Sequence, residues 1–214
     1  MLAERRGEVP GAQPEQCELC SAPIPSEHRH LLDLQTRRLL CACRACSLLF
    51  DRRSAGAGGT HYRLIPERRV ALTEFQLSDL TWERLRLPVE MAFFFHNSSA
   101  GRVMAFYPSP MGATESRLEL PAWDELQNAN PMLATLEPDV EALLVNRSRG
   151  ASRQWLVPIT DCYRLVAVIR TRWRGFTGGK EVWGEIDRFF GELDGMARPQ
   201  RQAPVSTERS EGNA

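Results

Sequence analysis

The chain has 214 residues, of which 43% are hydrophobic and 25% are charged. A chain of this length holds one medium domain with a small module, or two small domains, and its composition is too apolar for a disordered protein. The 27 basic and 27 acidic residues cancel. Net charge therefore gives no reason to expect a nucleic acid or an anionic membrane as a partner.

The N-terminal segment argues against export. Residues 1–16 are polar and lack the apolar stretch of a signal peptide. No segment has the roughly 18 apolar residues that a membrane span needs. We therefore expect a cytoplasmic protein without a membrane span. Cysteines that cluster in a cytoplasmic protein are more often metal ligands than disulfides.

Changes in composition divide the chain into five parts. We expect a flexible arm at 1–14, a four-cysteine metal-binding ribbon at 15–53, a linker at 54–60, an α+β domain at 61–197 and a disordered tail at 198–214. The linker reads SAGAGGT, which is typical of a flexible connector. The tail is polar and interrupted by proline.

Four of the six cysteines form two Cys-x-x-Cys pairs, Cys17 with Cys20 and Cys43 with Cys46. Two such turns joined by a hairpin place four thiolates in a tetrahedron, which is the geometry of structural zinc sites. The 22 residues between the pairs are slightly more than a zinc ribbon usually has, but a hairpin fills them. The same thiolates could hold iron, as in rubredoxin. Zinc is favoured, because rubredoxin turns carry proline and glycine where this chain reads CELCS and CRACS.

Cys41 and two histidines lie close to these pairs in the sequence. On a strand, Cys41 would point to the same face as Cys43. It could be an additional ligand, a thiol beside the site, a fifth cysteine of an iron–sulfur cluster, or a small buried hydrophobe. His28 and His30 also alternate, and they could supply a ligand, hydrogen-bond to sulfur, or simply lie at the surface.

After the linker, apolar periodicity and turn residues predict a mainly antiparallel sheet with packed helices. The fold class is therefore α+β, with a zinc-ribbon-like four-cysteine module ahead of the sheet. The first predicted elements are a strand at 62–72, a helix capped by Ser78 and reaching Leu85, and a hairpin of strands at 89–95 and 102–107. A helix at 123–129, a helix or buried strand at 137–144 and a strand at 155–159 follow. The last two elements are a helix capped by Asp161 and ended by Gly175, and a helix at 181–196.

No arrangement of residues in this domain predicts catalysis. Cys162 opens a predicted helix, where the helix field favours a thiolate, but no partner base lies nearby in the sequence, so packing is the favoured role. Residues 172–179 precede the last helix and could bind an anion, although they match neither a P-loop nor a dinucleotide fingerprint. We predict no catalytic and no cofactor-binding residue, and a protein that is not an enzyme.

Several segments together resemble a known family. They read CELC, EHRHLLDL, LLCACRACSLLFDR, VEMAFFFHNSSAGRVMAFYPSPMGATES, NPMLATLEPDVEALLVNR and CYRLVAVIRTRWRGFTGG. They are similar to a bacterial domain-of-unknown-function family, mostly actinobacterial, that is encoded beside genes of actinobacterial-type nickel–iron hydrogenases. The resemblance covers residues 15–195.

This resemblance implies a role near hydrogenase assembly, metal delivery or electron transfer. We therefore expect an accessory protein of a nickel–iron hydrogenase system with a structural zinc site, whose partner is a hydrogenase subunit or a maturation factor. The alternative is a rubredoxin-like or iron–sulfur protein that carries electrons for the hydrogenase. In either case no nucleic-acid partner is expected.

Overall fold

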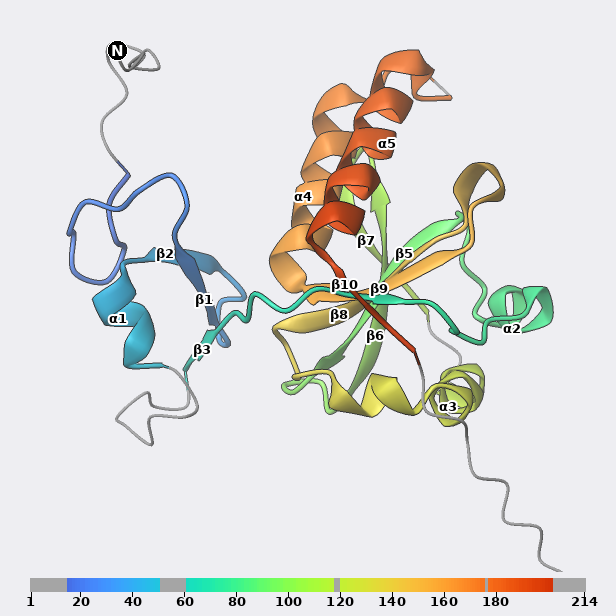
Figure 1. Ribbon diagram of the computed structural model, residues 1–214, viewed down its shortest axis with the longest axis horizontal. Helices are drawn as coiled ribbons and strands as arrows, with labels where there is room; N and C mark the ends of the chain where they lie inside the picture. Colours follow the sequence, from blue (N-terminus) through green and yellow to red (C-terminus); the bar gives the residue numbers. More distant parts are fainter. Residues whose placement is uncertain (1–14, 51–60, 118–119, 176, 202–214) are drawn as a thin grey trace, which may run out of the picture. The chain divides into compact units, whose positions relative to one another are not determined.

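The computed structural model describes residues 15–50, 61–117, 120–175 and 177–201 (Figure 1). The predicted arm, the predicted linker and the tail from residue 202 lie outside the described residues. The chain divides into two compact units, one up to Leu64 and one from Ile65. The division therefore falls shortly after the predicted linker, and a strand that follows the linker belongs to the first unit.

The first unit is a small three-stranded antiparallel sheet with one short helix. The strand order is β2-β1-β3, and one face of the sheet carries a core cluster with three buried side chains, Leu31, Leu40 and Ala42. A core of this size is too small to stabilise a fold alone. The elements are β1 (Arg29–Asp33), β2 (Leu39–Ala42), α1 (Arg44–Leu48) and β3 (Tyr62–Leu64).

The second unit is built on a seven-stranded sheet with the order β10-β4-β9-β8-β5-β6-β7. Every pairing is antiparallel except that of β10 with β4. The strands are β4 (Val70–Leu72), β5 (Met91–Asn97), β6 (Arg102–Ser109), β7 (Gly112–Ser116), β8 (Glu141–Asn146), β9 (Arg153–Pro158) and β10 (Arg198–Gln200).

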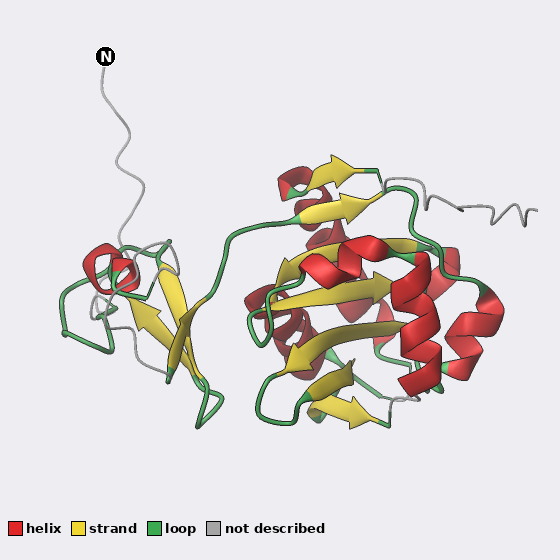
Figure 2. Cartoon of the chain, turned by 90° about the horizontal axis from the view of Figure 1, so that it is seen from below, coloured by secondary structure: helices red, strands yellow, loops and turns green. Residues whose placement is uncertain are grey.

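Helices cover both faces of this sheet (Figures 1 and 2). Trp155 stacks on Phe190 of α5 with ring centroids 5.1 Å apart, and Phe94 stacks on Trp123 of α3 on the opposite face at 5.4 Å. The helices are α2 (Asp79–Arg84), α3 (Leu120–Ala129), α4 (Ile159–Arg172) and α5 (Gly179–Met196), with short 3-10 turns η1 (Pro131–Thr135) and η2 (Ser148–Gly150).

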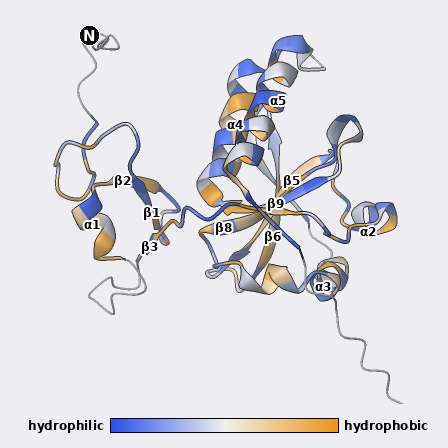
Figure 3. Ribbon diagram, viewed as in Figure 1, coloured by the Kyte–Doolittle hydropathy of each residue, from blue (hydrophilic) through white to orange (hydrophobic). Residues whose placement is uncertain are grey.

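Burial on both faces explains why the central strands are almost continuously apolar. Phe93, Phe94 and Phe95 are all buried although they alternate between the two faces of β5, and β8 is buried along its whole length. Figure 3 shows the hydrophobic colour along the central strands, whereas α4 and α5 alternate between hydrophilic and hydrophobic residues. The predicted class is thus confirmed: a mainly antiparallel sheet with packed helices follows the four-cysteine module.

Three predicted elements differ in the structure. The strand predicted at 62–72 is two strands in different sheets, because Pro66 lacks an N–H for the ladder and interrupts pairing. The segment at 137–144 forms the buried strand β8, one of the two predicted alternatives, from residue 141 onward. Residues 198–200, predicted to be disordered, form the parallel edge strand β10 beside β4.

The helix predicted to be capped by Asp161 begins earlier, at Ile159, directly after strand β9. Asp161 lies in the first turn, where its carboxylate accepts hydrogen bonds from the Arg69 guanidinium at 2.6 and 3.1 Å. The helix ends at Arg172, because Trp173 already has an extended backbone, and Gly175 follows in the turn. Asp161 therefore forms a buried salt bridge with Arg69 and does not cap the helix.

The turn into α5 requires glycine at residue 178. Gly178 has φ 83°, and a Cβ there would lie 2.7 Å from Cγ1 of the fully buried Val182 and 3.0 Å from the Trp173 ring. We expect Gly178→Ala to lower the free energy of unfolding by about 2–4 kcal/mol, from left-handed strain together with overpacking. Urea unfolding followed by tryptophan fluorescence measures this loss.

Gly179 provides the matched control. Its φ is 77°, but a Cβ there would meet nothing within 4 Å. Gly179→Ala should therefore cost only the backbone strain, about 1–2 kcal/mol. Equal losses for the two variants would contradict the packing argument.

Candidate metal centre

The first Cys-x-x-Cys pair lies in a tight turn at the start of the described chain. The Cys17 N–H donates to the carbonyl of Ala22 at 2.8 Å, and the Ser21 N–H donates back to the carbonyl of Cys17 at 2.8 Å. Ser21 has φ 60°, which lets the chain reverse immediately after Cys20. The turn therefore directs both sulfur atoms to the same side.

The second pair lies where strand β2 passes into helix α1. Cys43 is the N-cap of α1, and its Sγ accepts a hydrogen bond from the Cys46 N–H at 3.4 Å. This contact is the sulfur counterpart of the usual serine or aspartate cap. The first turn of the helix thereby brings Cys46 back toward Cys43.

The structure brings all four predicted cysteines together. Their Sγ atoms lie within 4.8 Å of one another, and those of Cys20 and Cys43 are 3.7 Å apart. A tetrahedral zinc ion with Zn–S bonds of about 2.3 Å would place its ligands about 3.8 Å apart. All six cysteines of the chain are free of disulfides. The four sulfur atoms and their spacing therefore fit a metal ion bound by four thiolates.

Charge in this four-cysteine cluster concentrates on the buried Cys17. Burial raises the pKa of its thiol, but hydrogen bonds from the backbone N–H groups of Cys43, Leu19 and Cys20 outweigh burial and lower the pKa to about 6. Hydrogen bonding with Cys20, together with burial, raises the pKa of Cys46 to about 12. Without a metal, the thiol of Cys17 therefore ionises more readily than that of Cys46, and binding of a divalent cation releases protons from the cluster.

Glu18, inside the first pair, ties that turn to the edge strand β2. Its N–H donates to the carbonyl of Cys41 at 2.9 Å, and its Oε2 accepts from the Cys41 N–H at 2.6 Å. Its Oε1 also lies 3.4 Å from the Arg38 guanidinium. Sequence reasoning missed this contact, because a single acidic residue between two cysteines gives no signal of its own.

The side chain of Cys41 joins a different cluster from that of Cys43. The ligand atoms of Cys41, His28 and His30 lie within 4.8 Å of one another. The strand alternation that predicted a shared face with Cys43 stops at Ala42, where β2 ends and the chain turns into α1. Burial lowers the pKa of His30, and the neighbouring His28 lowers it further, so neutral imidazole is favoured there.

Cys162 is fully buried in the first turn of α4. Burial, with a smaller contribution from the negative charge of Asp161, raises the pKa of its thiol well above the ordinary value. The thiolate is the reactive species, so this residue is a poor nucleophile. The packing role that the sequence favoured agrees with this environment.

We expect iodoacetamide to leave Cys162 unmodified in the native protein at pH 8 and to modify it rapidly in denaturant. Peptide mass spectrometry of timed samples measures both rates. The exposed Cys20, after metal removal, is the internal positive control because its side chain is open to solvent. Rapid labelling of Cys162 in the native state would contradict the buried role.

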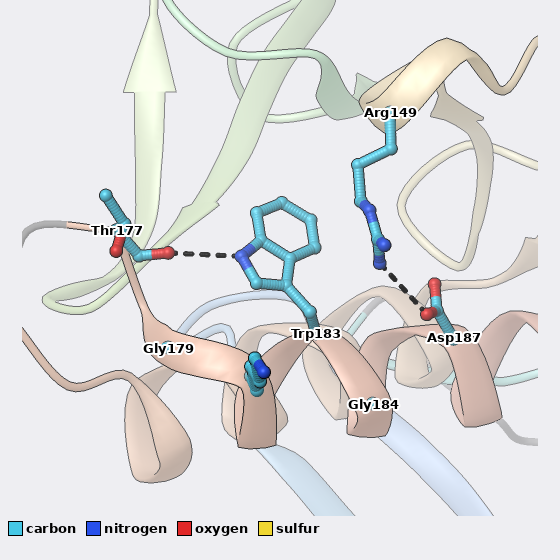
Figure 4. A pocket seen from close by; sticks show the side chains of 7 residues that line it. Arg149, Thr177, Gly179, Trp183, Gly184 and Asp187 are labelled. Atoms are coloured by element: carbon cyan, nitrogen blue, oxygen red, sulfur yellow. Dashed lines mark hydrogen bonds and ion pairs between the residues drawn. The ribbon is translucent and has the colours of Figure 1, made fainter.

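The segment predicted to bind an anion borders an open groove of about 560 Å³ at the start of α5 (Figure 4). Arg149 contacts Asp187 at 3.1 Å and lies 5.7 Å from the centre of the Trp183 ring. The indole N–H of Trp183 donates to the carbonyl of Thr177 at 3.1 Å. These polar groups of the groove bind one another, so the four-cysteine cluster is the stronger candidate site.

Comparison with known families shows the family of the chain but not its activity. It matches a family of unknown function, DUF5947, over residues 16–197, and it therefore belongs to that family. Comparisons with curated proteins and with solved structures gave no match. No helix among the described residues is long and apolar enough to cross a membrane. The family description names no activity, so the hydrogenase association implied by the resemblance stays a proposal.

Proposed function

We propose that this member of the DUF5947 family is a non-catalytic, metal-stabilised binding protein that serves a nickel–iron hydrogenase system in assembly or maturation. The observation that carries the metal-dependent part is the convergence of four cysteine sulfurs within 4.8 Å. They belong to a unit whose core cluster, among the described residues, has three buried side chains, with Leu32 and Ile24 buried outside it. A metal ion there would replace the core that the unit is too small to build.

Zinc is the metal that we propose for this site. Cys17, Cys20, Cys43 and Cys46 would fill all four tetrahedral positions, which leaves no position for substrate and is typical of a structural zinc site. Zinc would supply folding energy and no redox chemistry. The protein would work in the cytoplasm, where reducing conditions keep thiols available for metal.

Two observations support a protein partner. The resemblance to a family encoded beside hydrogenase genes suggests which partner to test. The ribbon also presents adjacent apolar side chains at the end of α1, where Leu48 and Leu49 are 56% and 62% exposed. Phe50, which follows them, packs edge-on against Tyr62 within the first unit. A protein partner that covered these two leucines would remove their apolar surface from water.

Affinity purification from cells that express the whole hydrogenase gene cluster tests the proposed function. The tagged wild-type chain should retain a hydrogenase subunit or maturation factor after washing, and Leu48→Ser with Leu49→Ser should lose it. Leu80→Ser is the matched control, because Leu80 is 66% exposed but lies on α2 of the second unit. Recovery of the wild-type chain alone would contradict the proposed partner.

One observation favours electron transfer as the second candidate function. Hydrogen bonds from the backbone N–H groups of Cys43, Leu19 and Cys20 lower the pKa of the Cys17 thiol, and hydrogen bonds to sulfur also tune the potential of iron–thiolate sites. An iron-loaded site would give a coloured protein with a reversible one-electron couple. A colourless protein from iron-replete, anaerobically grown cells would eliminate this candidate.

A further inference from the structure

We propose that the ribbon carries a second, separate metal site formed by His28, His30 and Cys41. The ligand atoms of these three side chains lie within 4.8 Å of one another. None of them belongs to the four-cysteine cluster. This inference is independent of any hydrogenase role, because it rests on the ribbon alone.

The strand register places the three ligands on one face of the sheet. His30 and Cys41 are paired directly across strands β1 and β2, so their side chains lie on the same face. His28 precedes His30 by two residues, and its ring centroid is 4.7 Å from that of His30. The core cluster with Leu31 and Leu40 occupies the opposite face. The spacing of the two histidines places them side by side, and strand pairing brings Cys41 to them.

The hydrogen bonding of His28 selects the tautomer that a metal at Nε2 requires. Its Nδ1 lies 2.9 Å from the carbonyl oxygen of Pro25, which can only accept, so Nδ1 carries the proton and donates it. In the neutral ring, Nε2 then offers a lone pair. A ligating histidine usually fixes its other nitrogen in this way, by donating to a carbonyl or carboxylate.

The lone pair on Nε2 of His28 is also buried without a partner. The His28 side chain is 7% exposed, and among the described residues no group hydrogen-bonds to its Nε2. A buried nitrogen without a partner costs about 1–3 kcal/mol. A metal ion bound to Nε2 would remove this cost, whereas a packing role for the histidine would leave it in place.

Two carboxylates add negative charge around these ligands. Oε2 of Glu15 is 3.6 Å from Nδ1 of His28, and Oε2 of Glu18 accepts from the Cys41 N–H at 2.6 Å. Both carboxylates act electrostatically on His30. A site with two imidazoles, one thiolate and nearby carboxylates favours a divalent cation.

The donor set indicates the class of metal. Two imidazoles and one thiolate suit zinc and the other late first-row divalent ions, and tetrahedral bonds of about 2.0–2.3 Å would place the ligands about 3.3–3.8 Å apart. The ligand atoms lie within 4.8 Å of one another, so metal binding would draw them closer together. Three protein ligands leave a fourth position for water or an exogenous ligand. This second metal would therefore exchange more readily than the one held by four thiolates.

Metal titration of the full-length chain tests the second site. The chain is first loaded with one equivalent of Zn²⁺, which the four-cysteine cluster takes, and is then titrated with Co²⁺. We expect a second equivalent to bind, with a sulfur-to-cobalt charge-transfer band from one thiolate. Cys41→Ser and His28→Ala should each weaken this second equivalent at least about 100-fold, since changes outside the ligand shell alone cost about 10–100-fold.

His61→Ala is the matched control, because His61 lies in the same unit but outside the cluster. It should bind the second equivalent as the wild type does. Retention of the first Zn²⁺ in every variant reports that the ribbon remains folded. A wild-type chain that binds one metal only, or a Cys41→Ser variant that still binds two, would overturn the second site while leaving the four-cysteine site and the proposed partner intact.

Discussion

Replacing Cys17 with serine is expected to unfold the ribbon and to leave the second unit folded. Cys17 is the buried member of the four-cysteine cluster, and the pKa of its thiol is lowered to about 6. Structural zinc contributes about 10–16 kcal/mol in small zinc-binding peptides, which is far more than the ribbon core can replace. Loss of one thiolate should therefore release the metal and unfold residues 15–50 and 61–64.

Limited proteolysis with mass spectrometry measures this effect. In Cys17→Ser, cleavage should accelerate throughout the ribbon, while a fragment beginning near Ile65 persists, because the two units are separately compact. Cys162→Ala is the control, since Cys162 lies in the second unit and should not change the metal content. An unchanged ribbon digest in Cys17→Ser would show that the fold does not depend on the metal.

Removing the Arg68 side chain should destabilise the second unit by about 3 kcal/mol. Arg68 makes two hydrogen bonds to the carboxylate of Glu141, at 2.9 and 2.7 Å, and the Glu141 side chain is only 2% exposed. In Arg68→Ala this buried carboxylate would keep the hydrogen bond from the backbone N–H of Glu137 at 2.9 Å but would lose its cationic partner. Breaking one side of a buried pair typically costs about 3–5 kcal/mol, and the partial exposure of Arg68 places this case at the low end.

Urea unfolding followed by tryptophan fluorescence measures that loss. Arg84→Ala is the matched control, because its partner Glu125 is exposed and such pairs contribute at most about 1 kcal/mol. In the Arg68→Ala background, Glu141→Gln should recover part of the loss by removing the buried charge. Equal midpoints for Arg68→Ala and Arg84→Ala would show that the Glu141 pair does not hold the sheet together.

The features that sequence reasoning predicted well are those with local causes. Two Cys-x-x-Cys turns around a hairpin predicted a four-cysteine cluster, and the alternation on either side of residues 96–101 predicted the hairpin of β5 and β6. Ser78 was predicted as the cap of α2, and its hydroxyl accepts from the Thr81 N–H at 3.0 Å. In each case the residues that determine the turn, hairpin or cap lie within a few positions of one another in the sequence.

The features that sequence reasoning missed depend on contacts between distant segments. Arg198–Gln200 forms a strand because the edge of β4 is close by, and nothing in its own residues indicates pairing. Asp161 resembles a cap in the sequence but pairs with Arg69, which is 92 residues earlier. Cys41 resembled a neighbour of Cys43, yet strand register sets it opposite His30. Register and long-range charge pairing leave no short-range pattern.

Elemental analysis with an absorption spectrum, on the full-length chain purified without oxygen, tests the central claim most directly. If the ribbon folds around a structural tetrathiolate zinc site, the protein will contain at least one zinc per chain and no iron, and it will be colourless. Iron with visible bands that bleach on reduction would contradict the structural role, and a metal-free chain with a folded ribbon would contradict the metal site itself.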